Sequence, residues 1–435
     1  MSFKRALGPF DATMVVIGGI IGTGIFVNPY IVARALDSTP LVLAAWVTGG
    51  LVALAGAFAY AELGQQQPQA GGPYVYLRDA WHPAVGFLYG WALLLMIETG
   101  AMAAVALNFA RYALRFVGQS DAAMPAVAIA AIALLTVINY LGVKPGSRVL
   151  NAFVVLKLTA LAVLIAFAWW GHPATASWLT DHRPDAPSGA LAFGTALIPI
   201  MFAYGGWQKA NYVAEEMRDP ERHLPRSLVF GTLAVVVIYL LANVAYLRTL
   251  GLAGLAATET PAADVAQLWL GANGSRFMSA TIAISTFGFL DLSILASPRV
   301  YYAMASDRTF FPSLARLHPR FQTPGLAIVL QSAWAIVLLL TGTYETLINT
   351  VTFADWIFFA LTVGGLFMLR RKFAGRIGFR TPGYPWLPAA FIAASLVVVF
   401  SVIRTDPMRA GIGAGLLALG IPVYYFFRRN DGMRQ

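Results

Sequence analysis

The stretch Val15–Pro29, with the sequence VVIGGIIGTGIFVNP, is apolar enough to lie inside a membrane, and yet it contains four glycines. Each glycine costs about 1 kcal/mol relative to alanine in the interior of a helix. Gly18, Gly19, Gly22 and Gly24 would therefore weaken a continuous helix. We expect this segment to interrupt a membrane-spanning helix rather than to continue it.

The composition of the whole chain is typical of a membrane protein. Of its 435 residues, 58% are hydrophobic and 11% are charged, whereas a soluble protein has about 25% charged residues. Apolar runs of about 20 residues, each long enough to cross a ~30 Å hydrocarbon core, recur throughout. We predict an all-α polytopic membrane protein with about twelve spans, near residues 10–36, 40–66, 83–112, 124–142, 149–170, 189–216, 227–249, 275–305, 325–342, 347–369, 386–404 and 410–427.

Basic residues are unevenly divided between the two predicted sides. Of the 30 Lys and Arg residues, 19 fall in loops on the side of the N-terminus and 8 in loops on the other side. The positive-inside rule then places both termini in the cytoplasm, and an even number of spans agrees with this. The same rule accounts for the net charge of +10, so we expect a cytoplasmic-membrane protein and no nucleic-acid partner.

Several kinds of chemistry are not indicated. The chain has no cysteine, which excludes disulfides, thiolate metal sites and cysteine nucleophiles. Its five histidines fall in predicted loops without the spacing of a metal site. Neither a G-x-x-x-x-G-K-[ST] loop nor a G-x-S-x-G elbow occurs. We expect no enzyme activity, no metal and no cofactor.

A second apolar segment is also interrupted by glycine. Ile198–Met217, IPIMFAYGGWQKANYVAEEM, carries Gly205 and Gly206 in the middle of the sixth predicted span. With five spans to each unit, the second unit must be inserted upside down relative to the first. Interrupted helices at matching positions of two inverted units indicate a transporter binding site. We expect one transmembrane domain, with repeats at 10–170 and 189–369 and two further helices at 386–427.

The physical use of such breaks follows from their unpaired backbone groups. One half-helix exposes N–H groups and the other exposes carbonyls, which hydrocarbon tolerates only where they line a cavity or hold a ligand. The N–H end attracts an anion, and the carbonyls attract a cation. A free amino acid carries both charges on adjacent atoms. The alternative is that the glycines only permit close helix packing.

Charged residues inside the predicted spans are further candidates, because they are costly in a membrane. Lys157 needs a polar cavity, backbone carbonyls or a carboxylate partner. Asp291 could pair with Lys157, attract a substrate cation or take up a proton. Glu98 is a similar candidate, or it lies at an internal polar contact. Lys209 could snorkel toward the inner surface or form a gating salt bridge.

Four separate segments carry a family resemblance. The G-x-G-I-F break, GGPYVYL followed by GFLYGW, and FAYGGWQKANYVAEEMRDPERHLPRSL resemble the amino acid–polyamine–organocation superfamily. The last of these, with AISTFG and SPRVYYAMASDRTFFP, is similar to the L-type amino acid transporter branch. The resemblance implies a LeuT-like fold of two inverted five-helix repeats plus two helices.

The resemblance also implies roles for individual residues. Phe202 would be an aromatic lid, and Lys157 would take the place of a sodium ion and bridge the first and eighth spans. Asp291 departs from the neutral residue expected in this branch, and Gly-Thr-Gly replaces the more usual Gly-Ser-Gly. The substrate carboxylate would bind amides around Thr23, Gly24 and Ile25, the ammonium would bind carbonyls near Ile20, Phe202 and Ala203, and Gly22, Tyr204 and Gly205 would complete the site.

We therefore expect a sodium-independent exchanger of L-amino acids that works by alternating access. Animal L-type carriers are tethered to a partner through a cysteine, a link that this chain cannot form. Two transporter alternatives remain: a proton-coupled symporter that uses Asp291 or Glu98, and an antiporter of amino acids and polyamines. A membrane-embedded amino acid sensor is the alternative from another class.

Overall fold

The computed structural model describes residues 5–170, 175, 178–342, 344–373 and 378–432. Regular structure in this part of the chain is helical, apart from two isolated bridges. The helices are α1 (Pro9–Ile20), α2 (Gly24–Ala35), α3 (Thr39–Gln66), α4 (Pro73–Ala80), α5 (Pro83–Ala92), α6 (Glu98–Val117), α7 (Met124–Tyr140), α8 (Val143–Trp170), α9 (Gly189–Tyr204), α10 (Lys209–Tyr212), α11 (Pro220–Ala257), α12 (Pro261–Leu270), α13 (Ala272–Ala296), α14 (Pro298–Ser306), α15 (Gly325–Thr341), α16 (Tyr344–Lys372), α17 (Trp386–Thr405) and α18 (Pro407–Gly432). A π-helical turn, Leu93–Ile97, joins α5 to α6.

The prediction of a polytopic helical membrane protein is confirmed. Within the described residues, 11 helical segments are long and apolar enough to cross a membrane. The segment predicted near 325–342 forms α15, which is apolar but shorter, at 17 residues. Large apolar side chains such as Leu51, Phe230 and Leu419 are exposed on the outside of α3, α11 and α18. Such exposure suits a surface that faces lipid tails.

Both predicted interruptions are present in the structure. The first span ends as a helix at Ile20 and begins again at Gly24, with residues 21–23 between α1 and α2. The sixth predicted span ends as α9 at Tyr204 and resumes at Lys209 as the short helix α10. Gly206 in this second break has a φ of +107°, a left-handed conformation that favours glycine. The glycines therefore break the helices as the sequence predicts.

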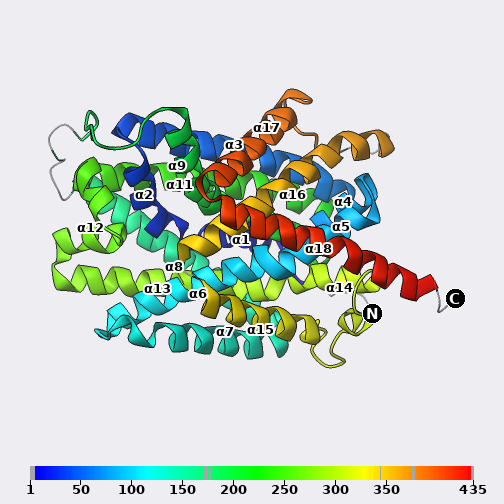
Figure 1. Cartoon of the computed structure of the whole chain (residues 1–435). Coiled ribbons are helices and arrows are strands. Elements are labelled where there is room, and N and C mark those ends of the chain that lie inside the picture. The colour runs from blue at the N-terminus through cyan, green and yellow to red at the C-terminus, as the bar shows by residue number, and fades with distance from the viewer. Residues whose placement is uncertain (1–4, 171–174, 176–177, 343, 374–377, 433–435) are drawn as a thin grey trace.

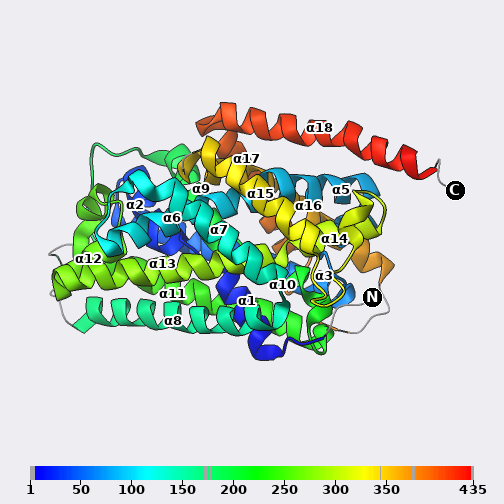
Figure 2. The ribbon, with the colours of Figure 1, turned by 90° about the horizontal axis from the view of Figure 1, so that it is seen from below.

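The two interrupted helices lie inside the bundle. α1 packs against α8, α11 and α13, while α2 packs against α9, α11 and α12. Figure 2 shows α18 along one side of the molecule and α8 along the opposite side. The described chain begins near the end of the molecule to which α18 runs, and α5 and α14 lie toward the same end (Figure 1). The opposite end carries α12.

Candidate functional site

The two breaks pack against each other with their backbones in close approach. A Cβ atom on Gly19 would lie 2.5 Å from the carbonyl oxygen of Gly206. A Cβ atom on Gly24 would lie 2.6 Å from the Cα of Ala203. Only glycine fits such contacts, since real Cβ atoms do not approach backbone atoms so closely. The glycines thus serve both to break the helices and to bring the two breaks together.

A cavity lies where the breaks meet. Both breaks contribute to its wall, together with side chains of α6, α13 and α16. The lining residues are Ile20, Gly22, Thr23, Gly24, Ile97, Glu98, Ala101, Val105, Met201, Phe202, Ala203, Gly205, Gly206, Gln208, Lys209, Phe289, Val351, Thr352, Asp355 and Trp356.

The structure brings most of the residues predicted for substrate binding to this cavity. Among the described residues, Ile25 and Tyr204 are the exceptions, since neither lines it. Tyr204 is buried behind the second break, with its ring 5.7 Å from that of Trp46 and 5.1 Å from that of Tyr239. The predicted residues that do line the cavity are Ile20, Gly22, Thr23, Gly24, Phe202, Ala203 and Gly205.

The ends of the half-helices have the polarity that the sequence predicts. α2 begins at Gly24, so the amides of its first turn, including those of Gly24 and Ile25, have no acceptor within the helix. α1 ends at Ile20 and α9 ends at Tyr204, so the last carbonyls of both point out of their helices. Helix ends of opposite polarity therefore border one space.

Lys157 binds the carbonyl end of α1. Its Nζ donates to the carbonyl oxygen of Ile21 at 2.5 Å and to that of Gly18 at 3.4 Å, and the residue is 0% exposed. A cation at the C-terminal end of a helix is favoured by the helix dipole. Of the three environments proposed for Lys157, the structure shows backbone carbonyls. α8, which carries Lys157, also packs along α13.

Tyr239, which the sequence analysis did not single out, contacts both breaks. Its hydroxyl donates toward the carbonyl oxygens of Ile20, at 3.1 Å, and of Ala203, at 3.3 Å. One proton is thus shared between the ends of α1 and α9. In the sequence, Tyr239 is one of several tyrosines in apolar spans, and nothing in its spacing reveals that it reaches both interruptions.

Glu98 and Lys209 form a buried ion pair on the cavity wall. Lys209 Nζ lies 2.5 Å from Glu98 Oε1 and 2.5 Å from Ser293 Oγ, and it is 4.2 Å from the centre of the Phe289 ring. Glu98 is the first residue of α6, directly after the π-helical turn. The snorkelling alternative for Lys209 is wrong, because its ammonium is bound inside the protein.

Asp291 lies elsewhere in the bundle. Its Oδ1 accepts a hydrogen bond from Asn139 Nδ2 of α7 at 2.6 Å. Pairing with Lys157 is not found in the described residues, since Lys157 bonds to α1 instead. Asp291 is also absent from the described lining of the cavity. It therefore lends no support to the alternative of a polyamine antiporter.

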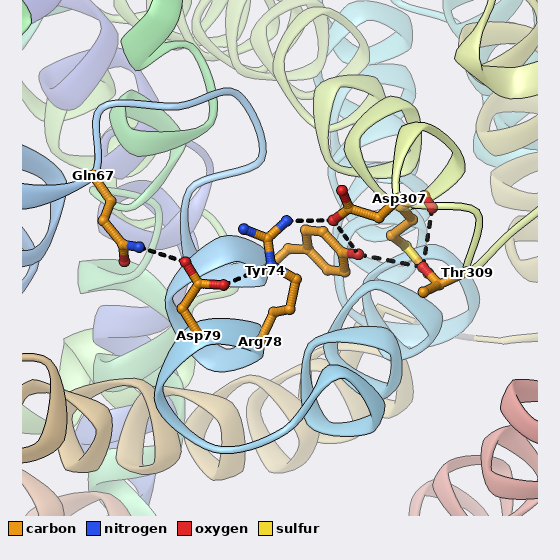
Figure 3. A network of polar contacts seen from close by, with 7 residues as sticks. Gln67, Tyr74, Arg78, Asp79, Asp307 and Thr309 are labelled. Atoms are coloured by element: carbon orange, nitrogen blue, oxygen red, sulfur yellow. Dashed lines mark hydrogen bonds and ion pairs between the residues drawn. The ribbon is translucent and has the colours of Figure 1, made fainter. Parts of the chain in front are cut away.

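A polar network joins α4 to the segment after α14 (Figure 3). The hydroxyl of Tyr74 donates to Asp307 Oδ2 at 2.8 Å, and Arg78 forms an ion pair with the same carboxylate. Arg78 also bonds to Asp79, which accepts from Gln67 Nε2 at 2.6 Å. Burial raises the pKa of Tyr74 well above its ordinary value, so its hydroxyl stays protonated at neutral pH. The network connects segments that are 233 residues apart.

Comparison with known proteins decides the family. The model of the family described as "Amino acid permease" matches residues 7–425. The chain belongs to the amino acid permease family. It is 32% identical over 432 residues to the serine/threonine exchanger SteT of Bacillus subtilis strain 168, and the alignment covers 98% of each chain. It is 32% identical over 443 residues to the human large neutral amino acids transporter small subunit 2, an alignment that covers 98% of this chain and 81% of the relative. It is 31% identical over 437 residues to the human cystine/glutamate transporter, with coverage of 98% of this chain and 86% of the relative.

Membership of the amino acid permease family confirms the resemblance drawn from the sequence. These relatives are transporters rather than enzymes, so the permease described here is a multi-pass membrane transporter. The described residues contain no group of three or more His, Cys, Asp or Glu side chains that could hold a metal.

Proposed function

We propose that this permease is a secondary active transporter that exchanges L-amino acids across the cytoplasmic membrane by alternating access. The observation that carries the proposal is the meeting of two helix breaks at one cavity, through the close approach of Gly19 to Gly206 and of Gly24 to Ala203. Helix ends of opposite polarity suit the two charges of an amino acid backbone. Exchange is favoured by the similarity of the chain to a serine/threonine exchanger.

In this proposal each break binds one charge of the substrate. The amides of Thr23, Gly24 and Ile25 bind the carboxylate, and Gly22 allows it to approach the backbone. The carbonyls of Ile20, Phe202 and Ala203 bind the ammonium. Tyr239 donates to two of these carbonyls, but a carbonyl oxygen has two lone pairs and can accept a second donor. Phe202 covers the substrate, Gly205 borders its side chain, and Tyr204 supports the second break from behind.

The fold that we propose is LeuT-like, with twelve crossings in all. The first inverted repeat covers residues 10–170, the second covers 189–369, and residues 386–427 add two helices. α15 would be the shortest crossing. Both termini would face the cytoplasm, in accord with the positive-inside rule.

Transport is proposed to need neither a sodium gradient nor a disulfide-linked partner subunit. The amino group of Lys157 occupies the end of α1, where a sodium ion would otherwise be attracted by the carbonyls. The absence of cysteine prevents a disulfide to a second subunit. The network of Tyr74, Arg78 and Asp307 would close the cytoplasmic side of the cavity in one of the alternating states.

Transport by purified protein in liposomes tests this proposal. Uptake of labelled L-amino acids is measured into vesicles that are empty or preloaded with unlabelled amino acids, with and without gradients of sodium and of pH. Uptake that needs internal substrate and ignores both gradients would support exchange. Uptake into empty vesicles driven by a proton gradient would instead support a symporter, for which the ion-paired Glu98 is the candidate in the cavity wall.

A further inference from the structure

Three ionisable side chains line the described part of the cavity. They are Glu98 of α6, Lys209 of α10 and Asp355 of α16. When ionised, two carboxylates and one ammonium leave one net negative charge. Since an amino acid backbone is neutral overall, binding it at the two breaks would not compensate that charge.

Lys209 already forms an ion pair with Glu98. Their side chains are only 2% and 3% exposed, and the ammonium of Lys209 donates a charge-assisted hydrogen bond to Glu98 Oε1. The hydroxyl of Ser293 and the ring of Phe289 also contact the ammonium. The charge of Lys209 acts on Asp355 as well, but so does the opposing charge of Glu98.

No hydrogen bond or ion pair of Asp355 is found among the described residues. It is 8% exposed, and its Oδ1 has no hydrogen-bond partner in the described structure. Thr352, one helical turn earlier on the same face of α16, also has a buried hydroxyl for which the described residues provide no partner. Both residues line the cavity. A buried ionised carboxylate without a partner is costly, and either a bound proton or a bound cation removes that cost.

We propose that this cavity selects amino acids with a cationic side chain, an ammonium or a guanidinium, and that Asp355 is the residue that binds the cation. The inference rests on the proposed function, because the breaks must hold the substrate backbone. Ala101, Val105 and Trp356 supply apolar wall along which a methylene stem can lie. Thr352 provides a hydroxyl that can accept from the same cation.

The test compares pairs of ligands that differ in side-chain charge and little in size. Dissociation constants of the purified full chain are measured by titration calorimetry for L-arginine against L-citrulline and for L-lysine against L-norleucine. The expected result is that each cationic ligand binds at least tenfold more tightly than its neutral partner, a difference of about 1.4 kcal/mol. Equal or tighter binding of the neutral ligands would overturn the inference.

Variants assign the preference to Asp355. Asp355→Asn keeps the shape of the side chain and should reduce the preference at least tenfold, whereas Asp355→Glu should retain it. Asp291→Asn removes a buried carboxylate outside the described cavity lining and should leave the preference as in the original protein. An unchanged preference in Asp355→Asn would contradict the assignment. If Asp355→Asn does not fold, Asp355→Glu decides the question. Loss of the preference for cationic ligands in Asp355→Glu would then contradict the assignment to Asp355.

The outcomes separate this inference from the proposed function. If L-leucine, L-alanine and the neutral analogues bind but L-arginine and L-lysine do not, the inference is wrong and the proposed amino acid transport stands. If none of these ligands binds to folded protein, the proposed function itself fails.

Discussion

The backbones of Gly19 and Gly206 approach so closely that a Cβ atom on Gly19 would lie 2.5 Å from the Gly206 carbonyl oxygen. These residues belong to two helices that are each interrupted, and the contact joins the two interruptions. It explains why a costly residue is placed in the middle of an apolar span. The site depends on this contact, and the first prediction tests it.

Gly206→Ala is expected to destabilise the protein. The new Cβ meets the backbone of Gly19, and the φ of +107° is unfavourable for alanine. Overpacking costs about 1–3 kcal/mol, and a left-handed conformation costs about 1–2 kcal/mol. Thermal unfolding in detergent measures the change. Gly411→Ala in α18 is the control, because nothing lies within 4 Å of its added Cβ, and equal melting temperatures of the two variants would contradict the prediction.

Tyr239→Phe is expected to impair transport through the loss of one hydroxyl. The ring keeps its packing against Trp46 and Tyr204, but the carbonyls of Ile20 and Ala203 lose their shared donor. The expected loss of stability is about 1 kcal/mol, with a slower rate of exchange. Tyr246→Phe on the same helix is the matched control, since that buried hydroxyl has no hydrogen-bond partner among the described residues. Exchange rates that fall equally in both variants would argue against a specific role for Tyr239.

Lys157→Met is expected to destabilise the first break. Without the ammonium, the carbonyls of Gly18 and Ile21 lose their side-chain donor, at a cost of about 1–3 kcal/mol for each unsatisfied group. Lys372→Met, at an exposed position, should leave the melting temperature within the error of the measurement. A stable Lys157→Met variant that still exchanges amino acids would show that the lysine is dispensable.

The pair of Glu98 and Lys209 is expected to show strong coupling in a double-mutant cycle. Removing one partner leaves a buried charge and costs about 3–5 kcal/mol. Glu98→Gln combined with Lys209→Met should therefore be less harmful than the sum of the single variants. Melting temperatures of the four proteins measure the coupling. Additive effects would mean that the 2.5 Å contact contributes little to stability.

Asp307→Asn is expected to open the end of the molecule near α4 and α14. The change weakens the ion pair with Arg78 and the bond from Tyr74 (Figure 3). Because the chain has no cysteine, a single Ala101→Cys substitution in the cavity wall reports on access to a membrane-impermeant thiol reagent. Labelling should be faster with Asp307→Asn than without it. Unchanged labelling from both sides of the membrane would show that the network does not close the cavity.

Sequence patterns predicted the two interruptions because glycine clusters in apolar spans have a local energetic meaning. The break expected at Gly22–Gly24 occurs at residues 21–23, and the second, expected at Ala203–Gly206, occurs between Tyr204 and Lys209. A charged residue in a span likewise indicates that some partner exists. It does not say which one, since that depends on how distant helices face each other.

The partners of the buried charges therefore required the structure. Lys209 and Glu98 are 111 residues apart in the sequence, and the π-helical turn before Glu98 changes which way that side chain faces. Asp291 has its carboxylate bonded to Asn139 and is not among the described residues that line the cavity, which the sequence also could not reveal. Asp355 is also a charged residue inside a predicted span, so the same criterion applies to it, although the sequence analysis did not name it.

The most direct test of the central claim is a counterflow measurement with chemically blocked amino acids. Vesicles containing the purified protein are preloaded with an L-amino acid, its amide or its N-acetyl derivative, and the uptake of the labelled amino acid is followed. If the two breaks bind the carboxylate and the ammonium, only the unmodified amino acid should drive uptake. Equal uptake with the amide or the N-acetyl derivative inside would show that the breaks do not bind the substrate backbone.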